Sequence, residues 1–133
     1  PHLPEEYSFN PLYLEYAHKW NQQRAFRDFE IGTPCVIIDN TNTTLREMEA
    51  YINYACPQEY EIQIEEPTSD RWKEVSELLR DKNQNREKLK AWAIKLEAGS
   101  AGIHNVPCFA IERMMWRWEC TKEILEVLNL RSL

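Results

Sequence analysis

The chain has 133 residues, of which 43% are hydrophobic and 29% charged, a composition typical of one globular domain and not of a disordered segment. Its formal net charge of −6 argues against broad, sequence-independent binding to nucleic acid, because contact with a phosphate backbone needs dense lysine and arginine. No run of about 18 apolar residues is present, so we expect no membrane span.

The first predicted element is a helix over residues 10–29. Asn10 is suited to cap it and Pro11 to occupy its first turn. An apolar face then recurs at helical spacing in Tyr13, Tyr16, Ala17 and Trp20. The sequence predicts that the helix stops before Gly32.

A strand–helix–strand unit is predicted next. The apolar run 35–39 is typical of a strand buried on both faces, and residues 60–66 alternate apolar and polar like a strand with one wetter face. Between them, Thr44 and Glu47 have capping-box spacing at the start of a helix over 44–55. Two strands joined in this way predict a right-handed βαβ crossover.

The rest of the chain is predicted to be helical. From Ser69 an apolar periodicity continues past the polar stretch 80–88, which indicates either one bent helix or two close ones. Residues 99–107 hold two of the three glycines and predict a flexible loop. A last helix is predicted from Pro107, continuing through Leu125 and Leu128.

Four cysteines, at positions 35, 56, 108 and 120, show no CxxC spacing and lie in apolar stretches. This pattern favours buried, reduced thiols of an intracellular protein over a disulfide framework or a metal site. A cytoplasmic and a mitochondrial location are equally compatible with the sequence. We expect no metal ligands.

The fold class predicted from these elements is α/β and helix-rich, with flanking helices around an incomplete parallel sheet of two strands. Parallel strands normally belong to larger sheets that are covered on both faces. Two strands with four or five helices therefore indicate that part of the sheet is missing.

Four stretches carry a family resemblance: residues 7–25, 35–55, 61–67 and 104–119. In this order they resemble the P-loop kinase-like domains of the polynucleotide-kinase group, and most closely the kinase-like domain of the Nedd-four-binding protein family. The resemblance covers most of residues 7 to 119, apart from the stretch around residues 74 to 100.

The resemblance implies a five-stranded parallel sheet whose first strand carries the phosphate loop and lies between the two predicted strands. Residues 1–133 would then be a single P-loop-kinase-like domain that lacks this strand and loop, with 99–107 as a lid-like loop. Two explanations are open. Either the chain is a fragment missing an N-terminal segment, or a protein partner supplies the missing strand.

Phosphoryl transfer is not expected from this chain alone. The phosphate-loop pattern G-x-x-x-x-G-K-[ST] is absent, so we assign no catalytic residue and expect ATP and magnesium only if a longer parent carries that loop. The resemblance also implies lid arginines where this chain has Ser100, Ala101 and Gly102. That departure counts against nucleotide turnover even in a longer protein.

The candidate substrate-binding residues follow the first predicted strand: Asp39, Asn40, Thr41 and Asn42. At the carboxyl end of a parallel strand they would face the crevice where α/β folds bind ligands. An equally good interpretation is that they close the turn and cap the next helix.

Arg24 could reach the same crevice, although a surface or ion-pair role is at least as good an interpretation. His104 matches a turn of the family's lid, and His18 is better explained as a surface residue. The tryptophans could stack bases, but at helical spacing in an acidic chain they favour a core or a partner interface: Trp20, Trp92, Trp116 and Trp118.

The sequence therefore predicts a kinase-like domain, related to polynucleotide 5′-hydroxyl kinases, that is not catalytically competent in this chain. The alternative is a degenerate kinase-like module that serves as a structural or protein-binding subunit, with its sheet completed by a partner chain. The lost lid arginines, the acidic charge and the many aromatic residues favour this alternative.

Overall fold

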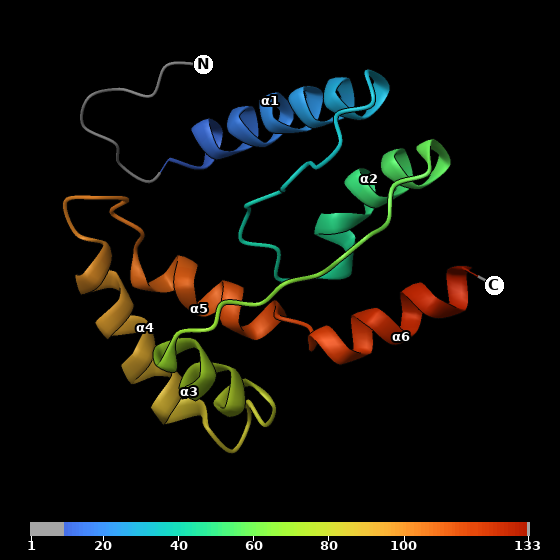
Figure 1. The fold of residues 1–133 in the computed structure, drawn as a ribbon. Coiled ribbons are helices and arrows are strands. Elements are labelled where there is room, and N and C mark those ends of the chain that lie inside the picture. The colour runs from blue at the N-terminus through green and yellow to red at the C-terminus, as the bar shows by residue number, and fades with distance from the viewer. Residues whose placement is uncertain (1–9, 133) are drawn as a thin grey trace.

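A computed structural model of the chain describes residues 10–132, and every regular element in that range is helical. Figure 1 shows α1 and α2 on one side of the molecule and α3, α4 and α5 on the other. In chain order the elements are α1 (Pro11–Glu30), α2 (Leu45–Ala55), the 3-10 turn η1 (Cys56–Gln58), α3 (Asp70–Leu79), α4 (Arg86–Ser100), α5 (Cys108–Arg117) and α6 (Thr121–Ser132).

The predicted α/β fold is wrong, since residues 10–132 contain no strand and no sheet. The two predicted strands, residues 35–39 and 60–66, are irregular segments. Within the described range, backbone groups of 35–39 and 61–66 form no hydrogen bonds with other backbone groups, and the N–H of Tyr60 donates to the carbonyl of Ala55, at the end of α2, at 3.5 Å. A strand exists only through such bonds with a neighbouring strand. The expected right-handed βαβ crossover and the parallel sheet are therefore absent from this part of the chain.

The apolar side chains of these two segments are nevertheless used in packing. Val36, Ile38, Tyr60 and Ile62 are partly buried against a core cluster formed by Ala25, Phe29, Tyr51 and Ala55, here called the α1–α2 cluster. Ile37, in contrast, is 83% exposed, so residues 35–39 are buried on one side only. Packing on helices explains why the sequence pattern resembles that of strands.

A second core, here called the α3–α5 cluster, holds the other half of the chain together. It consists of Val75, Leu79, Leu89, Ala93, Ile111 and Met115. Trp72 and Trp118 pack against it and meet edge to face, with ring centroids 6.0 Å apart. The apolar periodicity predicted for residues 69–118 therefore marks a real core.

The polar stretch 80–88 separates two helices, which resolves the alternative that the sequence left open. α3 ends at Leu79 and α4 begins at Arg86. The side-chain amide of Asn85 donates to the carbonyl of Leu78 at 3.1 Å, and the N–H of Gln84 donates to the carboxylate of Asp81 at 3.3 Å. These bonds satisfy backbone groups that the helix ends leave free.

The last predicted helix is also two helices, because the chain leaves helical geometry at Trp118, with φ −57° and ψ 130°. The ammonium group of Lys82 donates to the carbonyls of Trp116 and Trp118 at 2.9 and 2.7 Å. The helix ends here, so no following turn can supply N–H donors to these carbonyls, and Lys82 serves as the donor instead. Desolvation of Lys82 lowers its pKa, while the carboxylates of Glu119 and Glu123 act in the opposite direction.

The four cysteines are free thiols, but the expectation that they are buried is wrong, since none of the four is fully buried. Cys35 and Cys56 are exposed, while Cys108 and Cys120 are half-buried. Cys35 lies in a segment that no strand covers, and Cys56 begins the exposed turn η1 after α2. No helix within residues 10–132 has the length and apolar character to cross a membrane.

The α3–α5 cluster predicts a clear stability difference along α4. Leu89 is 2% exposed, so Leu89→Ala should lower the free energy of unfolding by about 2–5 kcal/mol through lost burial and a cavity. Ile94 lies on the same helix but is 56% exposed, and Ile94→Ala should change it by less than about 1 kcal/mol. Urea denaturation measures both, and equal losses would contradict this assignment of the core.

Candidate functional site

Asn40, one of the predicted site residues, is engaged with the two helices on either side of it. The side-chain amide of Asn21 on α1 donates to the side-chain oxygen of Asn40 at 3.2 Å and to the Tyr51 hydroxyl at 3.3 Å. Asn40 in turn donates to the Tyr51 hydroxyl at 3.2 Å. Tyr51 is buried, so this triangle of side chains fixes the segment after Pro34 against α1 and α2.

The other three residues of the predicted site do not join this triangle. Asp39 and Thr41 are exposed, and Asn42 is half-buried with its N–H donating to the carbonyl of Asn40 at 2.9 Å. The structure therefore favours the turn-closing interpretation for Asn42. A ligand-binding role for Asp39 and Thr41 stays a prediction.

Thr43 forms a polar junction that sequence reasoning missed. It is 6% exposed, and its hydroxyl donates to a carboxylate oxygen of Glu47 at 2.8 Å. The guanidinium Nε of Arg117 donates to that hydroxyl at 2.9 Å and lies 3.2 Å from Glu47. Residues of α2 and α5 therefore meet at one buried hydroxyl.

Backbone hydrogen bonds reinforce the same junction. The N–H of Glu119 donates to the carbonyl of Thr43 at 2.7 Å, and the Glu119 carboxylate accepts from the N–H of Leu45 at 2.8 Å. Thr44 caps α2 as predicted, by accepting from the N–H of Glu47 at 3.2 Å. The capping signal was visible in the sequence, but a partner 74 residues away was not.

Arg24 and His104 lie on different elements. Arg24 is on α1, where its guanidinium carbon lies 4.6 Å from the centroid of the Trp20 ring, a cation–π contact. His104 is exposed in the loop between α4 and α5, and its N–H donates to the carbonyl of Ser100 at 3.0 Å. Their predicted roles at a substrate stay predictions.

The predicted lid-like loop 99–107 is a compact turn that follows α4. α4 continues to Ser100, whose hydroxyl accepts from the N–H of Val106 at 3.1 Å. Gly102 adopts φ +77°, and its N–H donates to the side chain of Asn105 at 2.8 Å. Cys108 follows, and its pKa is raised by desolvation and by the carboxylate of Glu112, 3.6 Å away.

One exposed surface feature is an apolar stripe on the first half of α1, here called the α1 stripe. Its members are exposed: Leu12 (78%), Tyr13, Tyr16 (57%) and Trp20. At 3.6 residues per turn these four side chains fall within an arc of about 100°. The same geometry places the buried residues Ala25 and Phe29 on roughly the opposite side of the helix.

The other tryptophans divide between the core and the surface. Trp92 and Trp118 are partly buried against the α3–α5 cluster, and Trp116 is exposed with the guanidinium carbon of Arg86 4.9 Å from its ring centroid. Within the described residues, no group of three or more His, Cys, Asp or Glu side chains is arranged to hold a metal ion.

Comparison with known proteins supports a relation to one of them. The chain is 40% identical over 67 residues to NEDD4-binding protein 2 of Homo sapiens, a match that spans 50% of this chain and 4% of that protein. No family model matches the chain, and no solved structure matches it. This chain is thus related to NEDD4-binding protein 2 over half of its own residues.

The Asn40 triangle predicts that this residue stabilises the fold. Asn40→Ala removes its hydrogen bonds with Asn21 and Tyr51 and should lower the free energy of unfolding by about 1–2 kcal/mol. The exposed neighbour Asp39 is the control, and Asp39→Ala should change the free energy of unfolding by less than about 0.5 kcal/mol. Chemical denaturation of both variants measures this. If Asn40→Ala leaves the free energy of unfolding unchanged, the structural role of Asn40 is refuted.

Thr43→Val tests the junction, because it keeps the shape of the side chain and removes the bridging hydroxyl. We expect a loss of about 1–3 kcal/mol of unfolding free energy, since Arg117 and Glu47 each lose a hydrogen-bond partner. Thr41→Val makes the same chemical change at an exposed position and should have little effect. If the two variants unfold at the same denaturant concentration, the junction contributes nothing measurable.

Proposed function

We propose that the chain is a protein-binding module that docks on its partner through the α1 stripe. The observation that carries this proposal is the exposure of Leu12, Tyr13, Tyr16 and Trp20 on one side of one helix. Contiguous exposed apolar surface on a folded protein commonly marks an interaction site. Tyrosine and tryptophan are also among the residues enriched in protein interfaces.

The position of the stripe on α1 suits docking. The helix packs on its own protein through Ala25 and Phe29, near its C-terminal end and on roughly the opposite side. A partner can therefore cover the stripe without displacing the α1–α2 cluster. Apolar anchors separated by three, four and seven residues are the pattern with which a helix inserts into a hydrophobic groove. The guanidinium of Arg24 beside Trp20 adds a charged edge to this surface.

The similarity to the human relative supports a protein partner for this chain. The human relative is named as a protein that binds NEDD4, and this chain matches 4% of that relative's length. We therefore propose NEDD4 as the partner of the α1 stripe. The match covers half of this chain and a small part of the relative, so a shared partner is a proposal and needs a direct binding test.

We propose no enzymatic role for this chain. The kinase-like interpretation depends on the motif resemblance alone, and the side chain of Asn40, one of its candidate substrate-binding residues, is already bound to Asn21 and Tyr51. ATP and magnesium stay expectations tied to a phosphate loop in a longer parent. A degenerate module retained for protein binding agrees best with the exposed aromatic residues.

Tyr16→Ala is the sharpest test, because Tyr16 lies in the middle of the stripe. With purified NEDD4 and the fluorescently labelled chain, anisotropy should show binding that weakens about tenfold or more in this variant, as expected of an interface anchor. Phe109→Ala is a matched control, since Phe109 is equally exposed at 57% but lies on α5.

The control should bind like the unaltered chain, and both variants should keep their unfolding free energies, measured by urea denaturation, within about 0.5 kcal/mol of it. No binding to NEDD4, or equal weakening by the two variants, would contradict the proposed function.

A further inference from the structure

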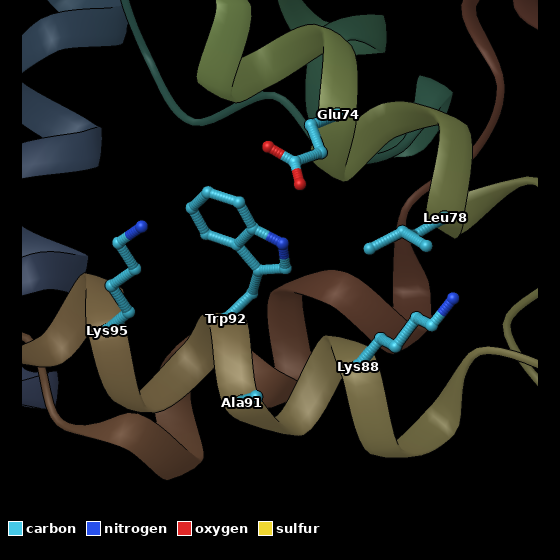
Figure 2. A pocket seen from close by; sticks show the side chains of 6 residues that line it. All are labelled: Glu74, Leu78, Lys88, Ala91, Trp92 and Lys95. Carbon is cyan, nitrogen blue, oxygen red and sulfur yellow. The ribbon is translucent and has the colours of Figure 1, made fainter.

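A groove between α3 and α4 lies apart from the α1 stripe. Its volume is about 470 Å³, and it is lined by Glu74, Leu78, Lys88, Ala91, Trp92 and Lys95. Figure 2 shows the Trp92 ring rising from α4 toward α3, with a lysine on either side of it. The groove is open to solvent, which suits a segment of protein better than a small molecule that must be enclosed.

The α4 wall has a regular spacing. Lys88, Trp92 and Lys95 lie at positions i, i+4 and i+7, so they share one side of the helix. Seven residues of helix separate the two lysine Cα atoms by about 10 Å along the axis. The wall thus presents a positive charge, an aromatic ring and a second positive charge in line.

The charges of this wall are available to a ligand. Neither lysine forms an ion pair within the described residues, and the ammonium nitrogen of Lys95 lies 4.5 Å from the centroid of the Trp92 ring. The chain as a whole has a net charge of −6, whereas the groove lining holds two lysines and one glutamate. Glu74, on α3, supplies one negative charge opposite Trp92.

We propose that this groove binds an acidic amphipathic helix of another protein. Two carboxylates seven residues apart on such a helix match the separation of Lys88 and Lys95. Apolar side chains between them, at the third and fourth positions, would cover Trp92 and Leu78. Glu74 disfavours a third carboxylate at the centre, so the partner's middle turn must be apolar.

Charge and spacing favour this occupant over a nucleic acid. A phosphate backbone would meet Glu74, and sequence-independent binding needs many more cations than the two lysines of this groove. A protein helix needs only two carboxylates and an apolar turn. Beyond a Debye length of about 8 Å at physiological salt, repulsion from the rest of the acidic chain is largely screened.

A designed probe tests the proposal. It is a fluorescein-labelled, alanine-rich helical peptide with Glu at positions i and i+7 and Leu at i+3 and i+4, compared with a peptide that has Gln in place of both Glu. We expect the Glu peptide to bind in fluorescence anisotropy, and about tenfold more tightly than the Gln peptide. Its binding should weaken as sodium chloride is raised.

Charge reversal on α4 locates the site. Lys88→Glu combined with Lys95→Glu should weaken binding of the Glu peptide at least tenfold. Lys90→Glu makes one such reversal at a residue of α4 that does not line the groove, and it should change the affinity less than about threefold, whereas Lys88→Glu alone should weaken binding more than Lys90→Glu does. Circular dichroism and urea midpoints check that all variants are folded, and Lys88→Gln with Lys95→Gln replaces any reversal variant that unfolds.

Three results would overturn the proposal. They are absence of binding by the Glu peptide at millimolar concentration, equal binding by the Gln peptide, and equal weakening by Lys90→Glu and the double variant. Displacement of the bound Glu peptide by a single-stranded oligonucleotide at lower concentration than by unlabelled Glu peptide would assign the groove to nucleic acid instead.

Discussion

The buried hydroxyl of Thr43 is the contact on which the arrangement of the described chain depends. The α1–α2 cluster and the α3–α5 cluster are separate apolar cores. The Thr43 hydroxyl joins them because it donates to Glu47 of α2 and accepts from Arg117 of α5. Glu119 adds two bonds, from its N–H to the Thr43 carbonyl and from the Leu45 N–H to its carboxylate. A buried polar group of this kind is specific because each lost partner leaves another polar group unsatisfied.

The sequence predicts the helices of this protein well and its strands wrongly, for one physical reason. A helix satisfies its backbone within itself, so local signals such as Asn10–Pro11 and the Thr44 cap are sufficient to place α1 and α2. A strand needs a neighbour, and residues 35–39 show the same apolar pattern whether they pair with a strand or pack on α1 and α2. Arg117 could not be placed beside Thr43, because no local pattern links residues 74 apart.

The two proposed surfaces use different chemistry and so imply different partners. The α1 stripe is apolar and aromatic, and burying it gains free energy in proportion to the area removed from water. The groove between α3 and α4 pairs one aromatic ring with two lysines, and its affinity should depend on salt. Because the first belongs to the α1–α2 half and the second to the α3–α5 half, the junction at Thr43 sets their relative positions.

Amide hydrogen exchange of the chain, alone and with purified NEDD4, tests the central claim most directly, because it maps contact along the backbone without any mutation. Docking through the α1 stripe predicts slower exchange in peptides from residues 11–23, with residues 86–100 unchanged. Unchanged exchange in residues 11–23 at saturating NEDD4 would contradict the account. Slower exchange confined to residues 35–39 and 61–66 would contradict it too, since the partner would then bind the irregular segments instead of α1.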